Sequence, residues 1–213
     1  ELTMKHHKDA ERQGFVKILM SGEIDHKLYA TYLYNQAQCY SVLEKYGLHN
    51  SLFRDTPNLL RTEHILYDFN SFGIETPEIT ESTKQYIDHI ESIQDEAMKL
   101  YAHVYVRHMG DLSGGQILKK IAQRAMNLQS TSGLSFYEFT QISDEQQFKS
   151  DYKAALDALP VTPDGSKQIV AEANVAFNLN MKVFQELETS FVRIAIRIVM
   201  NYINGFLAQF NLS

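Results

Sequence analysis

The stretch HMGDLSGGQILKK, residues 108–120, is the most informative part of this chain, because it places three glycines inside a segment that otherwise has the pattern of one long helix. Each glycine in a helix interior costs about 1 kcal/mol relative to alanine. Three of them cost roughly 3 kcal/mol, out of the ~5–15 kcal/mol that stabilises a typical domain. Gly110 and Gly114 share one helix face, which Gly115 widens, so the helix presents a strip of bare backbone.

A bare helical face suits either a neighbouring helix or a broad flat ligand, since glycine carries no side chain that keeps either at a distance. Spacing alone favours helix packing. Asp111 and Ser113 lie within the bare segment, however, and these residue types are neither strong helix formers nor frequent in protein cores. A contact between two helices has no use for a carboxylate there, so the flanking residues favour a ligand.

Helical patterning extends along the whole chain. Its 213 residues are 44% hydrophobic, its four prolines stand where a helix would begin or end, and no alternating strand pattern competes. These features predict one compact all-α domain over residues 1–213, built as a multi-helix bundle. Residues 129–143 are expected to be irregular. The expected helices cover residues 2–20, 25–46, 57–72, 83–103, 101–128, 144–160 and 166–210.

Charge and cysteine content limit the class of function. The net charge of −6 argues against a nucleic-acid-binding protein. Cys39 is the one cysteine, so no intrachain disulfide can form, which fits a reducing compartment and a cytoplasmic location. Residues 191–210 are apolar but contain two arginines and two asparagines. A membrane span needs ~20 largely uncharged residues, so this segment predicts a packed terminal helix.

Two adjacent histidines, His6 and His7, lie near the start of the chain in HHKDAE. His7, Ala10 and Glu11 share a helix face, where the small alanine leaves room for something large. The glutamate is suitably placed to hold the second ring nitrogen, as partners of metal-ligating histidines do. From spacing alone, a solvated terminal histidine pair explains the pattern more simply, so both interpretations stay open.

Several segments together resemble the heme oxygenase family. GDLSGGQILKKIAQ at 110–123 resembles the family's signature, and HKDAE at 7–11 resembles its proximal-histidine segment, H-x-x-A-E. FKSDYK at 148–153 resembles a later segment that carries basic residues, and EANVAFNLNMKVFQELE at 172–188 resembles the closing helix. The resemblance covers nearly the whole chain in the expected order. SFYEFTQISDE and the preceding AMNL are most similar to the cyanobacterial and cyanophage members.

The resemblance implies that heme b is held between a proximal and a distal helix, with Gly110, Gly114 and Gly115 on the distal one. It makes His7, rather than His6, the axial ligand of the iron. Asp111 then orders the waters that deliver protons, which is general acid catalysis at one remove. The residues that match the family's distal polar network are Tyr40, Tyr86, Arg107 and Asn180.

Tyr105, Lys149 and Lys153 match the family residues that hold the heme propionates, although two lysines four residues apart also fit a solvated face. Phe177 fits a hydrophobic wall of the heme pocket, and core packing explains it equally well. The chain departs from the family at Met4, where a basic residue is common. It departs again at His108, which replaces the tyrosine of the distal run R-Y-L-G-D and is expected to face outward.

The function implied by the resemblance is the cleavage of heme, as both substrate and cofactor, to biliverdin IXα, carbon monoxide and ferrous iron with O2. Electrons must come from an external reductant, because the sequence contains no flavin or nucleotide motif. A small ferredoxin is implied, docked on a basic surface near the heme edge, and a bilin reductase is a possible downstream partner. No nucleic acid and no membrane span are expected.

Three other functions fit parts of the sequence. An enzyme of a related helical fold that hydrolyses thiamin fragments would use Cys39 as its nucleophile, but that leaves GDLSGGQ unexplained. A heme-binding or storage protein would bind heme without turnover, and Asp111 argues against it. A di-iron carboxylate bundle needs two Glu-x-x-His motifs, of which the chain has only Glu23-Ile24-Asp25-His26.

Overall fold

The computed structural model describes residues 26–128, 132–157 and 162–186, and this part of the chain is helical without any strand. The all-α prediction is therefore confirmed there. Helices α2 (His26–His49) and α8 (Pro163–Glu186) are the longest, with 24 residues each. The expected helix 2–20 and the part of the last helix beyond residue 186 lie outside the described residues. The other α-helices are α3 (Thr62–Ser71), α4 (Glu81–Ser92), α5 (Ala97–Val104), α6 (Gly110–Ala125) and α7 (Glu145–Asp157).

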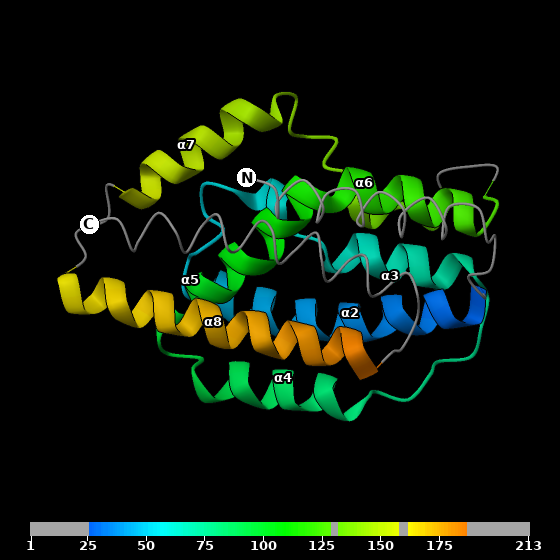
Figure 1. The fold of residues 1–213 in the computed structure, drawn as a ribbon, viewed down its shortest axis with the longest axis horizontal. Helices are drawn as coiled ribbons and strands as arrows, with labels where there is room; N and C mark the ends of the chain where they lie inside the picture. The colour runs from blue at the N-terminus through cyan, green and yellow to red at the C-terminus, as the bar shows by residue number, and fades with distance from the viewer. Residues whose placement is uncertain (1–25, 129–131, 158–161, 187–213) are drawn as a thin grey trace, which may run out of the picture.

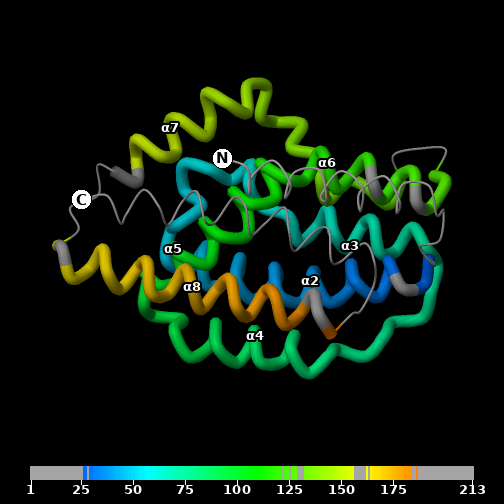
Figure 2. The backbone as a smooth tube through the Cα atoms, viewed as in Figure 1, coloured from blue at the N-terminus to red at the C-terminus, as the bar shows by residue number. Residues whose placement is uncertain are grey.

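Helix α2 is the central element of the bundle. It packs against α3, α4 and α5, and α8 packs against α4 and α5 (Figure 1; the tube in Figure 2 shows the same arrangement). Because neighbours surround it, α2 is buried on nearly all sides, including at Ala30, Leu33, Cys39 and Leu43. No helix in the three described stretches is both long enough and apolar enough to cross a lipid bilayer.

The expected helix 57–72 is interrupted by a contact with α2. Pro57–Leu59 forms a short 3-10 turn (η1), and α3 begins only at Thr62. The carboxylate of Glu44 on α2 accepts hydrogen bonds from the backbone N–H groups of Arg61, at 2.5 Å, and of Thr62, at 3.1 Å. A carboxylate at the start of a helix satisfies its free N–H groups and complements the helix dipole. The break is thus set by a residue distant in the sequence.

A similar interruption divides the expected helix 83–103. Helix α4 starts after Thr80, whose hydroxyl accepts a hydrogen bond from the N–H of Thr83 at 3.3 Å, and it ends at Ser92. Helix α5 begins at Ala97 after a turn over residues 93–95. Ile93, which directly follows the last residue of α4, is buried. The pattern of apolar residues therefore continues into this turn.

A single π turn, η2 (Tyr105–Met109), joins α5 to α6 inside the expected helix 101–128. Such turns bend a helix and are common at functional sites. The axes of α5 and α6 run in different directions on either side of it (Figure 1). Gly110 is the first residue of α6, so the glycine-rich stretch starts directly after the bend.

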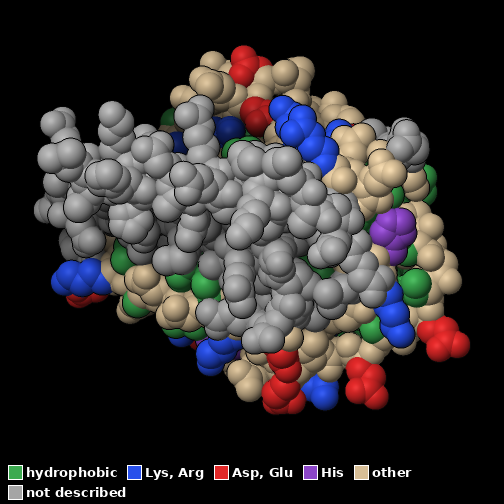
Figure 3. Space-filling model, turned by 45° about the vertical axis from the view of Figure 1, so that its right-hand side comes forward, with side chains coloured by type: hydrophobic (Ala, Val, Ile, Leu, Met, Phe, Trp, Pro, Cys, Tyr) green, Lys and Arg blue, Asp and Glu red, His purple; other side chains and the backbone are tan. Residues whose placement is uncertain are grey.

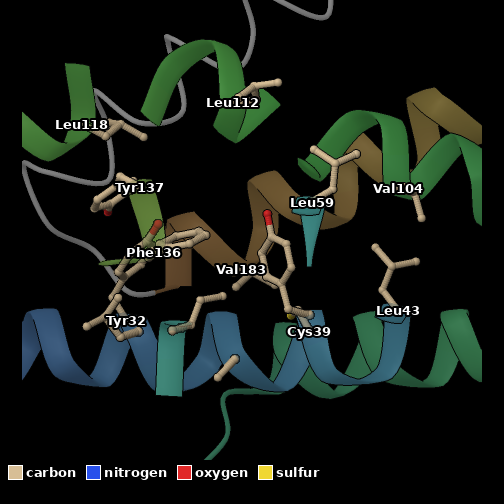
Figure 4. Close-up of a cluster of buried hydrophobic side chains, with 14 of the residues drawn as sticks. Tyr32, Cys39, Leu43, Leu59, Val104, Leu112, Leu118, Phe136, Tyr137 and Val183 are labelled. Carbon is tan, nitrogen blue, oxygen red and sulfur yellow. The ribbon is translucent and has the colours of Figure 1, made fainter. Parts of the chain in front are cut away.

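Residues 132–143 are irregular, as predicted for this part of the segment, apart from the short 3-10 turn η3 (Ser135–Tyr137). Figure 4 shows Phe136 and Tyr137 of this turn lying between Leu112 and Leu118 of α6 and the helix α2. The carboxylate of Asp68 on α3 holds the turn by accepting the backbone N–H groups of Ser135 and Phe136, at 2.9 and 2.6 Å.

Helix α7 stands apart from the central helices in Figure 1 and is anchored by Tyr152. The ring of Tyr152 stacks on that of Tyr101, with centroids 5.9 Å apart, and also contacts Tyr105. The N-cap of α7 is Asp144, whose carboxylate accepts the N–H of Gln147 at 2.9 Å, as the sequence predicts. On the face drawn in Figure 3, acidic and basic side chains are interspersed around the outer edge of the molecule.

Candidate functional site

Asp111 lies in the first turn of α6 and accepts a short hydrogen bond from the hydroxyl of Tyr40 on α2. Burial raises the pKa of Asp111 to about 6, although the Tyr40 hydrogen bond and the positive charge of Arg107 lower it in part. Burial also raises the pKa of Tyr40 well above its ordinary value, so its hydroxyl remains a donor. Asp111 is therefore ionised at neutral pH yet able to exchange a proton near it.

Arg107, in the π turn η2, joins the tyrosines of the predicted distal network. Its buried guanidinium donates to Oε1 of Gln36 at 2.9 Å. It also lies over two aromatic rings, at 5.0 Å from the centroid of Tyr40 and 4.3 Å from that of Tyr86. Cation–π contacts of this kind stabilise a buried cation. The structure thus brings Tyr40, Tyr86, Arg107 and Asp111 together from three helices and the π turn, as the sequence predicts.

Several buried polar atoms on α2, the π turn, α6 and α8 have no hydrogen-bond partner among the described residues. They are Nε2 of Gln36, Nε and Nη2 of Arg107, Oγ of Ser113 and Oδ1 of Asn180. Asn180 comes from α8, which packs against the π turn. Native proteins satisfy nearly all such atoms with protein groups, ordered water or a ligand. The arrangement therefore fits a site that holds water or a ligand beside Asp111.

The two ends of the bare strip on α6 differ. Gly110 has an ordinary helical φ of −61°, and no heavy atom of the described residues lies within 4 Å of a Cβ built on it. At Gly115 a Cβ would meet Cδ1 of Tyr137 at 3.5 Å, which is ordinary packing. Gly114 is buried between them. Gly110 is thus buried in an ordinary helical conformation, and among the described residues it leaves room for further atoms at its Cβ position.

The residues predicted to hold the propionates are close to one another through α7. The ring of Tyr105 lies 6.1 Å from that of Tyr152, which stands between Lys149 and Lys153 in the sequence of α7. Lys149 makes a loose ion pair with Glu145 at 3.7 Å, and Lys153 is exposed. Both lysines are therefore able to turn toward an anion.

Phe177 on α8 is half-buried and packs against a small apolar cluster of α5, η2 and α8. The cluster consists of Ala102, Val106, Ile169, Ala173 and Ala176. Packing against this cluster accounts for Phe177 without a ligand. His7, the predicted axial ligand, lies outside the described residues, so its role stays a prediction.

The prediction that His108 faces outward is wrong. Its side chain is fully buried, with Nε2 3.1 Å from Oε1 of Glu44 and Nδ1 3.3 Å from the carbonyl oxygen of Val104. Its ring meets the edges of Tyr40 and Phe53, with centroids 4.9 and 5.1 Å away. A histidine can be buried where a carboxylate satisfies its ring, and local spacing does not reveal a partner 64 residues away.

Gln36 and Glu44 are site residues that the sequence prediction missed. Both lie on α2 at four-residue spacing from Tyr40, so they share its face of the helix. Their spacing of four residues from the candidate catalytic Tyr40 was the sequence feature that could have identified them. Glu44 also carries a low pKa: burial alone would raise it, but hydrogen bonds from His108 and Thr62 lower it.

The structure speaks against Cys39 as a nucleophile. The thiol is fully buried, and burial raises its pKa. Reactive cysteines have a lowered pKa and are partly exposed. Figure 4 shows Cys39 on α2 within a cluster of buried hydrophobic side chains. For the di-iron alternative, His26 places Nε2 3.1 Å from the carbonyl oxygen of Met126, and Glu23 lies outside the described residues.

Comparisons with known proteins agree with this site. The family model described as heme oxygenase matches residues 1–186. A heme oxygenase of Guillardia theta is 47% identical over 213 residues, covering 95% of this chain and 90% of that protein. Heme oxygenase 1 of Synechocystis sp. is 38% identical over 91% of this chain and 84% of its own length.

Solved structures show the same fold. The crystal structure of heme oxygenase-1 from Synechocystis, in complex with heme, is 36% identical with a TM-score of 0.70, over 94% of this chain and 95% of that one. The heme oxygenase of Leptospira interrogans is 37% identical with a TM-score of 0.73, over 86% of this chain and 95% of that one. On the sequence motifs, the site geometry and these similarities, this chain belongs to the heme oxygenase family.

Proposed function

We propose that this heme oxygenase binds heme b against the open side of α6 and cleaves it with O2 to biliverdin IXα, carbon monoxide and ferrous iron. The observation that carries the proposal is the polar cluster of Tyr40, Arg107 and Asp111 beside the open space at Gly110. Bound heme supplies both the iron centre that activates O2 and the carbon that is oxidised. The chain itself supplies the binding surface, the proton path and the orientation.

Asp111 is the residue that handles protons in this proposal. Its pKa of about 6 lets the carboxylate pass protons near neutral pH through ordered water. The hydroxyl of Tyr40 fixes the carboxylate, and the guanidinium of Arg107 favours its ionised form. The unpartnered atoms of Arg107, Ser113 and Asn180 offer hydrogen bonds that hold the waters in place.

His7 is proposed as the axial ligand, with Tyr105, Lys149 and Lys153 binding the two propionates. A lysine pair repels itself slightly, and two carboxylates between the lysines turn this repulsion into attraction. Gly114 and Gly115 extend the bare strip, and Phe177 and Tyr86 border the site. Fixing the propionates fixes which edge of the porphyrin faces Gly110, and this is the basis for expecting the IXα isomer.

Reduced ferredoxin is proposed as the electron donor, docked on a basic surface near the heme edge, since an acidic partner is steered by positive charge. A bilin reductase, which would take biliverdin as its substrate, is the proposed downstream partner. The relatives from Guillardia theta and Synechocystis are consistent with such a setting. A cytoplasmic location is proposed with it, because the single cysteine Cys39 is free and buried.

The test mixes the purified protein with one equivalent of hemin, then adds ascorbate or reduced ferredoxin in air. We expect loss of the Soret band, growth of bilin absorbance and release of carbon monoxide, with one biliverdin isomer on chromatography. His7→Ala is expected to abolish turnover while heme still binds, and His6→Ala serves as its matched control. A stable Soret band without bilin would show a heme-binding protein instead, and loss of the histidine-ligated spectrum in His6→Ala alone would place the ligand at residue 6.

A further inference from the structure

A second polar cluster, which the proposed reaction does not use, joins three helices on the other side of Tyr86. Nε2 of His89 on α4 and Nε2 of His103 on α5 lie 2.6 and 2.9 Å from the same atom, Oε1 of Glu172 on α8. We propose that His89, His103 and Glu172 form a binding site for a divalent transition-metal cation of the zinc class. One potential ligand atom from each residue lies within 4.8 Å of the others.

The donor set suits zinc. Two imidazole nitrogens and one carboxylate oxygen, with water in a fourth position, form one of the standard zinc environments, with bonds of about 2.0–2.2 Å. Ligand atoms of a tetrahedral site then lie roughly 3.3 Å apart. The two nitrogen–oxygen pairs here are closer, so an entering ion has to widen them by roughly 0.4 to 0.7 Å. Side-chain rotation achieves shifts of this size without moving a helix.

The ligand side chains are already oriented by their surroundings. The hydroxyl of Tyr86 lies 3.2 Å from Nδ1 of His103, which directs Nε2 of the same ring toward Glu172. Holding the second nitrogen in this way is typical of metal-ligating histidines. The rings of His89 and His103 lie 5.2 Å apart at an angle of 39°, so both converge on the carboxylate. Helix α8 packs against α4 and α5, which fixes the three backbones.

Access also favours a metal. The side chain of His89 is 27% exposed, whereas that of His103 is buried, so an ion reaches the site past His89 and keeps a water ligand there.

The experiment uses the full chain without heme, stripped of metal by a chelator that is then removed. Zn2+ is titrated by calorimetry, and Co2+ is added as a spectroscopic probe, because its visible bands report coordination by nitrogen and oxygen. We expect one tight equivalent and a four- or five-coordinate Co2+ spectrum. Affinity should fall by at least about tenfold in His89→Ala and in Glu172→Gln. Circular dichroism checks that both variants are folded.

Two control variants separate this site from other histidines. His49→Ala removes an exposed histidine on α2, and a His6→Ala, His7→Ala double variant removes the adjacent pair near the chain start. Both control variants should still bind one equivalent of Zn2+ tightly. The proposal is overturned if the wild-type chain binds no Zn2+ equivalent tightly, or if His89→Ala and Glu172→Gln bind like the wild type. No heme is present, so neither outcome bears on heme cleavage.

Discussion

At the scale of single residues, Asp111 is the side chain whose replacement best tests the proton path. Asp111→Ala removes the carboxylate but leaves the open space at Gly110 and the proposed axial ligand, so heme affinity should stay nearly unchanged. Bilin yield should fall at least about tenfold, the scale of one positioned general acid or its water. Hydrogen peroxide should then be consumed with little bilin formed. Asp111→Asn keeps the shape and part of the hydrogen bonding, so it should be intermediate.

The measurement is product analysis of each purified heme complex after addition of reductant or peroxide. Asp151→Ala, an exposed carboxylate on α7, is the matched control and should behave as the wild type. If Asp111→Ala forms biliverdin normally, the proton path runs through other groups, and Tyr40 and Arg107 are then the residues to replace.

The buried pair of His108 and Glu44 permits a second prediction. His108→Phe keeps the aromatic contacts with Tyr40 and Phe53 but removes the hydrogen bond to the Glu44 carboxylate. A buried charged group that loses a partner destabilises a protein by about 1–3 kcal/mol. The remaining bonds from Arg61 and Thr62 keep Glu44 partly satisfied, so the lower half of this range is expected.

Urea unfolding of the heme-free protein measures this loss, with the exposed His49→Phe as control, which should change stability by less than about 0.5 kcal/mol. Unchanged stability in His108→Phe would show that the backbone donors suffice for Glu44.

The match to the family motif predicted some site residues correctly and misplaced one. Tyr40, Tyr86, Arg107 and Asp111 were all predicted from their match to the family pattern, and they do lie together. His108 was misplaced, because its neighbour Glu44 comes from another helix. A family motif predicts residues that act together. Whether a residue that differs from the motif is buried depends on the side chains that other helices place beside it.

At the scale of elements, replacing Gly110 distinguishes the effect of this glycine on helix stability from its effect on heme binding. Its helical φ and the empty space around it predict that Gly110→Ala is tolerated and stabilises the heme-free protein by up to about 1 kcal/mol. The added methyl group intrudes on the proposed heme surface, so heme affinity and turnover should fall. Gly115→Ala, which faces Tyr137, should gain similar stability with a smaller effect on heme.

Thermal unfolding without heme and heme titration by absorbance measure the two effects. Equal loss of heme binding in Gly110→Ala and Gly115→Ala would contradict the assignment of the open end of the strip. A large loss of stability in Gly110→Ala would show instead that the glycine serves packing, which is the interpretation that spacing alone favoured.

Helix α7 provides the test of the propionate assignment. Lys149→Glu and Lys153→Glu together should weaken heme binding, since carboxylates would face carboxylates, and more than one biliverdin isomer should appear because the heme is free to rotate in its plane. Lys167→Glu, an exposed position on α8, is the control. An unchanged affinity with a single unchanged isomer would refute the assignment.

The helix boundaries show where the local sequence pattern is not sufficient to predict the structure. Within the described residues, helices were expected in the right places, but two were predicted as continuous and are interrupted, near residue 60 and at 93–95. The first break follows from the Glu44 carboxylate at the start of α3, a tertiary contact. The π turn at Tyr105–Met109 was also missed, because YVRHM contains no proline or glycine that would mark it.

At the scale of the whole molecule, one carboxylate of helix α8 connects it to two other helices of the bundle. Glu172 bridges His89 on α4 and His103 on α5, so a single side chain connects three helices. The sequence predicted helices over these residues, with α4 and α5 as one continuous helix. It did not predict which faces meet, since pairings between helices far apart in the chain depend on side-chain fit rather than on periodicity.

This bridge predicts a specific pH dependence of stability. The folded pKa of Glu172 is about 2, because its histidine partners outweigh the effect of burial, whereas an unfolded glutamate has a pKa of about 4.3. A lowered folded pKa means that the unfolded chain takes up the proton first as the pH falls. The contribution of Glu172 is therefore complete above about pH 5 and is lost progressively toward about pH 2. Glu172→Gln cannot ionise, so it lacks this contribution at every pH.

The measurement is the free energy of unfolding of metal-free, heme-free wild type and Glu172→Gln, by urea at several pH values between about 3 and about 6. The wild type should be the more stable protein at the upper end, and the difference should shrink as the pH falls. Glu78→Gln, an exposed position between α3 and α4, should show no such trend. A difference that stays constant, or grows toward low pH, would mean that Glu172 is not held ionised by His89 and His103, and that other contacts, such as those of Glu186 with the start of α4, hold the three helices together.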